Sequence, residues 1–319
     1  MSERPYRSRR SVLAVPGSNP RMLEKASTLP ADAVFLDLED AVAPAAKEQA
    51  RRAVGEALTR YTWRAPTRTV RVNDWTTAWT VRDVVEVVET AGASIDAIVL
   101  PKVTDAGHVR ALDLILTQLE RELDLPVGRI EIEPQIEDAR GLTAIDAIAA
   151  ASDRVTTLVF GPGDFMASLG MRTLVVGDQP PGYEPGDAYH HVLATILVAA
   201  RARNLQAIDG PYTRVRDAEG FRRSAARTAA LGYDGKWVLH PDQIDAANEI
   251  FGPDPEEFRR AVALLEAYRF HTSGAGGARG AIVFGDEMVD EAGAKIAERV
   301  VARGRAAGLD ATPAADHTL

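Results

Sequence analysis

Eight apolar runs of strand length recur along the chain, and a segment with helical periodicity follows each of them. Near-continuously apolar strands that alternate with amphipathic helices are typical of a parallel sheet covered by helices. Eight such units in about 250 residues match the dimensions of a (β/α)8 barrel, the TIM barrel. The expected strands span residues 11–15, 33–38, 69–73, 97–100, 130–136, 157–160, 205–208 and 236–239.

An open, doubly wound sheet is the alternative fold for the same alternation. Such sheets usually carry a glycine-rich GxGxxG turn after the first strand, where a dinucleotide binds. Here the first strand runs into "AVPGSNPR", which lacks that pattern. We therefore expect residues 1–250 to form a TIM-barrel catalytic domain.

The segment from residue 251 onward does not repeat the barrel unit. It contains an amphipathic helix, "EEFRRAVALLEAYRF", a glycine-rich link, a short apolar stretch and a final helix, "GAKIAERVVARGRA". We expect residues 251–319 to form a C-terminal helical arm. Residues 309–319, at its end, are expected to be disordered.

Composition excludes several classes of function. The chain has 319 residues, a formal net charge of −9 and no cysteine. The acidic charge argues against binding to nucleic acid or to anionic membranes, and without cysteine there is no thiolate catalysis, disulfide or cysteine-liganded metal. No apolar run approaches the ~18 residues that span a bilayer, and the run in "RSRRSVLAV" is too short for an export signal. These features predict a cytoplasmic protein with no membrane or nucleic-acid partner.

Polar residues follow almost every expected strand, at the end of a barrel where active sites lie. Glu137 follows the fifth strand, and Asp164 follows the sixth, 27 positions later. Two carboxylates on neighbouring strand ends suit a hard cation such as Mg²⁺, or Mn²⁺ in its place, which keeps some waters and binds substrate oxygens. The other strand-end residues are Asn19, Asp37, Glu39, Asp40, Arg71, Asn73, Lys102, Asp209 and His240.

Each carboxylate also has a purely structural interpretation. Glu137 could cap or form an ion pair near the helix that follows it, and Asp164 could be the N-cap of the next helix, a common position for aspartate. Taken singly, the structural role of each carboxylate is about as well supported as its role as a metal ligand. Their joint placement favours the metal site.

Arg71 interrupts the apolar strand "TVRVN". Because an unpaired buried guanidinium is costly, we expect it to face carboxylates or an anionic ligand. The alternative is a structural ion pair with Asp37 or Glu39. Both can hold at once, since such a pair can orient a catalytic arginine.

Other polar residues carry weaker signals. Asp209, in "AIDGP", and His240, in "LHPDQ", are typical of turns, and we do not expect either to be catalytic. Arg7, Arg9 and Arg10 precede the first strand, so we expect them at the opposite end of the barrel, exposed to solvent.

The helix after the first strand is basic. It begins near Pro20 and carries Arg21 and Lys25. A helix N-terminus with nearby cationic side chains can bind phosphate, so we expect these two residues at the catalytic end of the barrel.

Several long motifs together resemble one known family. They are "SVLAVPGSNPRMLEKA", "DAVFLDLEDAV", "RVNDWTT", "IVLPKV", "PQIEDARGL", "LVFGPGDFMASLG", "QAIDGPY" and "GYDGKWVLHPDQIDAANEIF". With them the chain resembles the HpcH/HpaI aldolases, in particular the citrate lyase beta-chain-like CoA-ester lyases, and within these it is most like the malyl-CoA/β-methylmalyl-CoA lyases. The resemblance extends over residues 9–304.

The resemblance implies a Mg²⁺-dependent TIM-barrel enzyme that assembles as a trimer or hexamer. Its reaction would be reversible cleavage of L-malyl-CoA or β-methylmalyl-CoA to acetyl-CoA or propionyl-CoA and glyoxylate. The family's metal ligands fall on Glu137 and Asp164, and its arginine for the thioester carbonyl falls on Arg71. The arm resembles that of stand-alone lyases, which implies free CoA esters as substrates.

Further roles follow from the resemblance alone. The family's "MID" motif reads "MVD" here, which makes Asp290 the acid/base that acts in a neighbouring subunit's site. Asp290 could instead merely cap the last helix, or Asp286 could act in its place. Coenzyme A would lie along Asn19, Arg21 and Lys25.

Other activities remain open on the same scaffold. They are a malyl-CoA thioesterase, a citramalyl-CoA lyase, a pyruvate aldolase without CoA and a non-catalytic barrel. The sequence does not distinguish glyoxylate from pyruvate or acetyl-CoA from propionyl-CoA.

Overall fold

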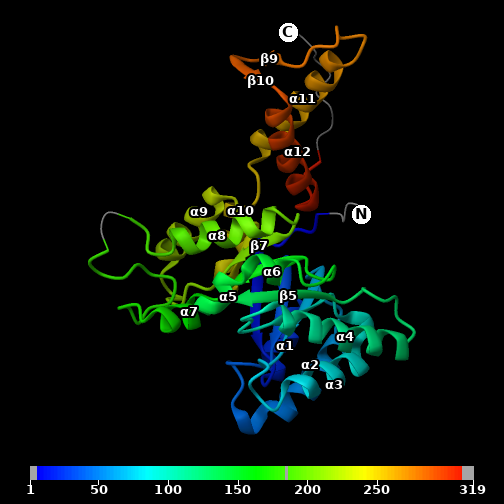
Figure 1. Cartoon of the computed structure of the whole chain (residues 1–319), viewed down its shortest axis with the longest axis vertical. Helices are drawn as coiled ribbons and strands as arrows, with labels where there is room; N and C mark the ends of the chain where they lie inside the picture. The colour runs from blue at the N-terminus through cyan, green and yellow to red at the C-terminus, as the bar shows by residue number, and fades with distance from the viewer. Residues whose placement is uncertain (1–5, 184–185, 311–319) are drawn as a thin grey trace. The chain divides into compact units, whose positions relative to one another are not determined.

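The computed structural model describes residues 6–183 and 186–310 (Figure 1). The chain divides into two compact units, each described here by itself. One is Arg9–Phe251, and the other is Gly252–Leu319 together with Met1–Ser8. The disorder expected for residues 309–319 concerns a stretch that, from 311 on, lies outside the described residues.

The unit Arg9–Phe251 is a closed parallel barrel in which β1 to β8 pair in sequence order and β8 pairs with β1. The predicted TIM barrel is confirmed. Its strands are β1 (Ser11–Pro16), β2 (Ala33–Asp37), β3 (Thr67–Arg71), β4 (Ala97–Leu100), β5 (Glu131–Ile136), β6 (Thr157–Phe160), β7 (Gln206–Asp209) and β8 (Gly235–Val238).

Helices cover the outside of the barrel, and α2, α3 and α4 lie side by side along it (Figure 1). The α-helices are α1 (Pro20–Ser27), α2 (Lys47–Arg60), α3 (Thr80–Ala91), α4 (Ala106–Glu122), α5 (Ala139–Thr143), α6 (Ile145–Ala149), α7 (Pro162–Leu169), α8 (His190–Arg201), α9 (Ala218–Leu231) and α10 (Ile244–Phe251). Short 3₁₀ turns span Pro44–Ala46, Gly92–Ser94 and Pro241–Gln243. The segment expected as one helix after β5 is two short helices, because the backbone leaves helical geometry at Ala144.

The apolar residues form two layers, because successive side chains of a strand point to opposite faces. The larger layer fills the space between strands and helices; Val34, Leu36 and Val70 belong to it. The smaller layer fills the barrel interior and includes Phe35 and Trp237. The interior is therefore packed with side chains, as expected for a barrel of this size.

Strand β5 departs from this apolar pattern. Glu131, Glu133, Gln135 and Glu137 alternate with apolar residues and so share the interior face. The expectation that Arg9 is exposed to solvent is wrong. Its side chain is 1% exposed and forms ion pairs with Glu133 and, at 3.6 Å, with Glu131. The acidic residues on the interior face of β5 stabilise the buried charge of this arginine.

The second unit contains α11 (Pro255–Thr272), α12 (Glu291–Ala306) and an antiparallel hairpin of β9 (Ile282–Phe284) and β10 (Glu287–Val289). The two helices share an apolar core that includes Phe258. Gly304 lies against the Phe258 ring, where a Cβ atom would collide. The tail is thus a folded helical hairpin with a small sheet.

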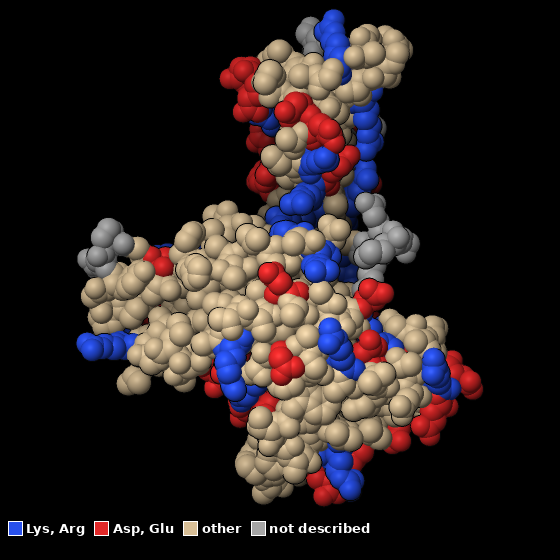
Figure 2. Space-filling view, viewed as in Figure 1, with Lys and Arg blue, Asp and Glu red and all other residues tan. Residues whose placement is uncertain are grey.

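Two surface properties bear on partners. On the face in Figure 2, groups of acidic and basic side chains alternate among uncharged residues. In residues 6–183 and 186–310, no helix is long and apolar enough to cross a membrane.

Candidate active site

A cavity of about 420 Å³ opens at the carboxyl ends of the barrel strands. Apolar residues such as Val15, Phe35 and Trp237 form part of its lining. Its polar lining comes from β2, β3, β5, α7 and the loops that follow the strands, and includes Asp37, Asp40, Arg71, Gln135, Glu137 and Asp164. The fold therefore brings Arg71, Glu137 and Asp164 together, as predicted.

Glu137 lies buried just beyond β5, and both of its carboxylate oxygens accept hydrogen bonds. The main-chain N–H of Lys102 donates to Oε1 at 2.7 Å, and Nε2 of Gln135 donates to Oε2 at 2.6 Å. Asp138, the next residue, is the N-cap of α5, so Glu137 does not cap that helix. Burial and then the charge of Glu39 raise the pKa of Glu137 well above its usual value, against the opposing effect of Arg71.

Gly161 explains the sequence "FGPGD" that precedes Asp164. A Cβ atom at this position would collide with the Glu137 carboxylate and with the Gln135 amide. Only glycine lets the end of β6 approach the end of β5 so closely. Pro162 then begins α7, a position where its missing N–H costs nothing.

Asp164 lies in the first turn of α7, whose N-cap is Gly161. The alternative in which Asp164 is itself the N-cap is therefore wrong. Its side chain is 44% exposed, and its Oδ2 lies 3.4 Å from Nζ of Lys102. A half-exposed carboxylate at the cavity wall is accessible to a cation and its waters.

Arg71 forms a bidentate ion pair with Asp37, with Nε–Oδ1 and Nη2–Oδ2 distances of 2.7 Å. Its Nη1 lies 2.9 Å from Oε2 of Glu39. Its guanidinium carbon lies 5.6 and 5.3 Å from the ring centroids of Phe35 and Trp237. The structural ion pair and the position at the cavity are thus both present.

The Arg71–Asp37 pair keeps both groups ionised. Burial disfavours the charge on each side chain, but the partner outweighs it: Asp37 raises the pKa of Arg71, and Arg71 lowers the pKa of Asp37. Asp37 also accepts main-chain hydrogen bonds from Glu39 and Ala41. The guanidinium is therefore a permanent, rigidly held cation at the cavity.

Glu39 and Gln135 each carry an unsatisfied acceptor. Glu39 Oε2 and Gln135 Oε1 are buried and have no hydrogen-bond partner among the described residues; the 2.9 Å contact of Arg71 with Glu39 lacks hydrogen-bond geometry. Burial raises the pKa of Glu39 to about 7, against the charge of Arg71. Buried polar atoms without partners are rare and mark places where a ligand, ion or water binds.

The acidic side chains at the cavity fit a divalent cation. Among the described residues, Arg71 and Lys102 form ion pairs with four carboxylates at or beside the cavity, those of Asp37, Glu39, Asp40 and Asp164. Glu137 lines the same cavity without such a pair. All the potential ligands are oxygens, as Mg²⁺ prefers. In the part of the chain that the structure describes, no group of three or more His, Cys, Asp or Glu side chains is arranged so that it could hold a metal ion.

Sequence reasoning assigned no function to three residues of this site. Glu39 is expected from the sequence only as a strand-end residue and a possible ion-pair partner of Arg71, Lys102 only as a strand-end residue, and Gln135 not at all. Two signals could have found them. Gln135 continues the period-two run of polar residues in "EIEPQIE", and Lys102 directly follows the apolar strand in "IVLPKV", at the end of the barrel where active sites lie.

The predicted CoA-binding residues lie at the start of α1. Asn19 is the N-cap and accepts from the Met22 N–H at 3.2 Å. Arg21 and Lys25 are exposed and share one helix face, being four residues apart. Pro16 and Met22 line the cavity, which places this helix beside it. Their contact with coenzyme A stays a prediction.

Asp290 belongs to the C-terminal unit, where it is the N-cap of α12. Its Oδ1 accepts from the N–H groups of Ala292 and Gly293, at 2.9 and 3.1 Å. The capping role considered as an alternative is therefore present. Asp286 lies exposed in the turn between β9 and β10. The acid/base role of Asp290 stays a prediction.

Asp209 is the last residue of β7, and His240 lies at the turn after β8. That neither is catalytic stays a prediction. Asp209 accepts from Nζ of the buried Lys236 at 2.5 Å and from Thr228 at 3.1 Å. His240 forms a capping box with Gln243 at the turn after β8.

The chain belongs to the HpcH/HpaI aldolase/citrate lyase family, whose model matches residues 10–241. It is 38% identical over 311 residues to the L-malyl-CoA/β-methylmalyl-CoA lyase of Cereibacter sphaeroides, with 93% of this chain and 95% of that protein covered. The resemblance found in the motifs is thus confirmed, and the family is one of carbon–carbon lyases.

Two further relatives bear on the chemistry. A (3S)-malyl-CoA thioesterase from Cereibacter sphaeroides is 37% identical over 278 residues, with 86% of this chain and 89% of that protein covered. The crystal structure of protein CitE from Mycobacterium tuberculosis in complex with magnesium, acetoacetate and coenzyme A is 30% identical. It has a TM-score of 0.71 and covers 95% of this chain and 99% of that chain.

Proposed function

We propose that this protein is a Mg²⁺-dependent CoA-ester lyase that reversibly cleaves L-malyl-CoA, β-methylmalyl-CoA or both into acetyl-CoA or propionyl-CoA and glyoxylate. The observation that carries the proposal is the convergence of Glu137, Asp164 and Arg71 on one cavity of a barrel whose relative is a malyl-CoA lyase. Mn²⁺ could replace Mg²⁺, since the ligands are oxygens in both cases.

Glu137 and Asp164 would hold the cation. When bound, Mg²⁺ supplies a Lewis acid that polarises the hydroxyl and carboxylate oxygens of the malyl group. Glu137 is the rigid ligand, since two hydrogen bonds and the close approach of Gly161 hold its carboxylate in place. Asp164 is the accessible ligand, at the solvent side of the cavity.

Arg71 would stabilise the charge that carbon–carbon cleavage places on the thioester oxygen. Two of the five guanidinium N–H groups of Arg71 donate to Asp37, which leaves others for the substrate. Because the bidentate pair and the rings of Phe35 and Trp237 fix the guanidinium, little reorganisation is needed at the moment of reaction.

The proposal extends to the residues outside this cluster. Asn19, Arg21 and Lys25 would bind coenzyme A, whose phosphates suit the basic face of α1. Asp290 would act as acid/base in a neighbouring subunit of a homotrimer or homohexamer, with residues 251–319 as the arm that brings it there. We infer a cytoplasmic location, where CoA esters occur.

The proposal is tested by mass spectrometry of CoA thioesters. The purified full chain is incubated with Mg²⁺, acetyl-CoA or propionyl-CoA, and glyoxylate or pyruvate, with EDTA as control. A metal-dependent malyl-CoA or methylmalyl-CoA peak is the expected result. A citramalyl-CoA peak alone would show that the substrate is pyruvate and not glyoxylate. If no product forms in any mixture, the proposed lyase activity is rejected.

A malyl-CoA thioesterase is the second candidate, since a relative with that activity covers 86% of this chain. Both reactions begin from the same thioester, but the thioesterase releases free malate and the lyase releases glyoxylate. Supplying malyl-CoA and measuring both acids separates them.

A further inference from the structure

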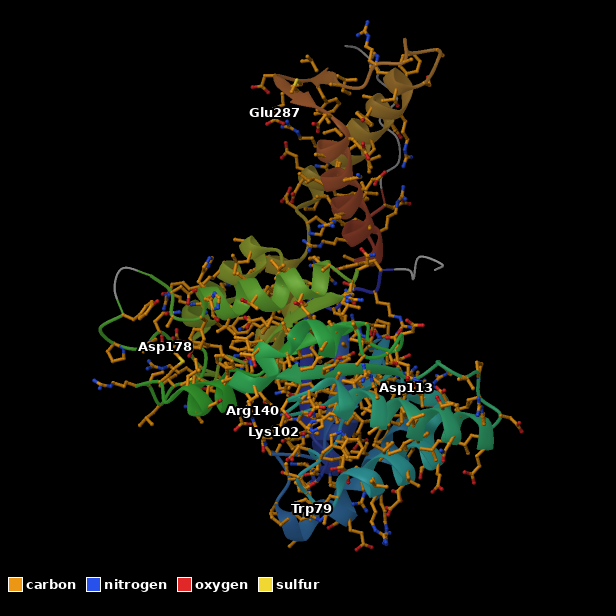
Figure 3. The ribbon with its side chains drawn as sticks, viewed as in Figure 1. Trp79, Lys102, Asp113, Arg140, Asp178 and Glu287 are labelled. Atoms are coloured by element: carbon orange, nitrogen blue, oxygen red, sulfur yellow. The ribbon has the colours of Figure 1, made fainter. Side chains whose placement is uncertain are left out.

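Lys102 places a positive charge among the acidic side chains of the cavity. Figure 3 labels Lys102 in the unit Arg9–Phe251. Its Nζ lies 2.6 Å from Oε1 of Glu39, 3.5 Å from Oδ1 of Asp40 and 3.4 Å from Oδ2 of Asp164. Glu39 and Asp40 follow β2, whereas Asp164 lies in α7. The ammonium therefore bridges two different sides of the acidic cluster.

The backbone of Lys102 contacts the other expected metal ligand. Its N–H donates to Oε1 of Glu137 at 2.7 Å, and its φ of 51° is in the left-handed region. A residue with a Cβ atom adopts this region at a cost of about 1 kcal/mol or more. One residue thus binds both Glu137 and Asp164, in a conformation that local preference disfavours.

We propose that Lys102 is an internal competitor for the divalent cation: its ammonium neutralises Asp164 when the metal is absent and gives up Asp164 when the metal binds. The inference rests on the proposed function and adds to it a determinant of metal affinity. Lys102 is a positioning residue here, since it acts on the metal ligand and not on the substrate.

Coulomb repulsion requires the exchange. A divalent cation on Asp164 and an ammonium within 3.4 Å of the same carboxylate would repel each other strongly in a partly buried site. Glu39 offers the lysine a shorter contact, at 2.6 Å, that does not involve Asp164. After displacement the ammonium would keep Glu39 and Asp40, so the exchange leaves no buried charge unpaired.

The competition has a benefit in the metal-free protein. Without a cation, neighbouring carboxylates repel one another, and the lysine offsets part of that repulsion. The cost is weaker metal binding, because the cation must displace the ammonium. Removing the charge of Lys102 is therefore expected to tighten metal binding and to destabilise the metal-free protein.

The test is calorimetric titration of the EDTA-treated, dialysed full chain with Mg²⁺. Lys102→Gln removes the charge and keeps an unbranched side chain. Lys102→Asn removes it with a residue that tolerates the left-handed conformation, so the experiment does not depend on one variant folding. Arg52→Gln is the control, because Arg52 pairs with the exposed Glu48 and its replacement also lowers the net charge by one.

We expect both Lys102 variants to bind Mg²⁺ at least tenfold more tightly than the wild type, and Arg52→Gln to bind within about twofold of it. In EDTA the Lys102 variants should melt at a lower temperature than the wild type, and Mg²⁺ should raise their melting temperature more. Neither the Mg²⁺ affinity nor the melting temperature depends on turnover.

Two results would overturn the inference, and they differ in meaning. Equal or weaker Mg²⁺ binding by both variants, with a wild type that binds, would reject the role of Lys102 and leave the proposed lyase intact. No Mg²⁺ binding by the wild type or by either variant would reject the competitor together with the metal site of the proposed function.

Discussion

Buried charged groups are arranged differently at the two ends of the barrel. At the amino end of the strands, Arg9 is enclosed with Glu133 and Glu131, and its side chain is 1% exposed. At the carboxyl end, burial raises the pKa of Glu39 and of Glu137, so the ionised form of each carboxyl group is disfavoured in the absence of a cation. One strand, β5, supplies residues to both ends.

The difference separates stability from function. Removing one partner of a closed, buried ion pair costs several kcal/mol, so the amino end holds the barrel together. Surplus buried carboxylates reduce stability, and proteins keep such groups where a ligand or reaction uses them. The following predictions, from the largest expected effect to the smallest, test this separation.

Glu137→Gln and Asp164→Asn should each lower kcat by more than about 10³-fold, because neutral amides bind Mg²⁺ poorly and the Lewis acid is lost. The far-ultraviolet circular dichroism spectrum should not change. The measurement is the rate of glyoxylate formation from malyl-CoA at saturating Mg²⁺.

Asp242→Asn, the same chemical change at a side chain that is 85% exposed, is the control and should keep full activity. Mg²⁺-dependent turnover by Asp164→Asn close to that of the wild type would show that Asp164 is not a metal ligand.

Arg9→Met should lower the free energy of unfolding by about 3–5 kcal/mol, since it removes the buried cation that faces the carboxylates of Glu131 and Glu133. The kcat of the folded fraction should stay that of the wild type. Urea unfolding and turnover of the same preparation test both statements. A loss of kcat comparable to that in the metal-ligand variants would contradict the separation of the two ends.

Arg71→Lys should lower kcat/KM by about 10²–10³-fold, because an ammonium cannot pair with Asp37 bidentately and also face the thioester oxygen. The measurement is the steady-state rate of malyl-CoA cleavage.

Arg154→Lys is the matched control for Arg71. This arginine is also buried and also pairs with two carboxylates, Asp113 and Glu120, both at 2.6 Å. Its replacement should lower stability but not kcat/KM. An equal loss of kcat/KM in both variants would mean that Arg71 acts through stability alone.

The stability of the metal-free protein should fall as pH rises from about 5 to about 7. Burial raises the pKa of Glu39 from 4.5 to about 7, so in this range the folded protein holds a proton that the unfolded chain has lost. Stability gained from that proton is present at low pH and is lost as the pH approaches 7. The expected effect on the free energy of unfolding is on the order of 2 kcal/mol.

Urea unfolding in EDTA at pH 5 and pH 7 measures this difference, with Glu39→Gln as the comparison. The variant should show a smaller fall between the two pH values, because its amide does not titrate. An equal pH dependence in both proteins would assign the effect to other groups.

Much of the barrel could be predicted from the sequence because its signals are local. The strands and helices follow from apolar periodicity, and strand ends identify the catalytic end before any contact is known. Glu137, Asp164 and Arg71 were found in this way. Asp164 was placed correctly at the start of a helix, but its position within the first turn depends on the cap at Gly161.

The residues that sequence reasoning missed depend on contacts between distant segments. Arg9 lies 124 positions from its partner Glu133, and Lys102 lies 63 positions from Glu39. No periodicity records such pairs, because the barrel brings the segments together only when it closes. The same holds for the unpartnered oxygen of Gln135, which is visible only once every neighbour is in place.

The sequence by itself determined the alternation that makes a (β/α)8 barrel, the family and the residue types at the strand ends, since these follow from local pattern and residue identity. The tertiary structure decided which charges are closed into pairs and which remain in surplus. That outcome depends on burial and distance, which fix the energy of each charge and exist only in the folded chain. The acidic cavity with Lys102 among its carboxylates is therefore a property of the fold.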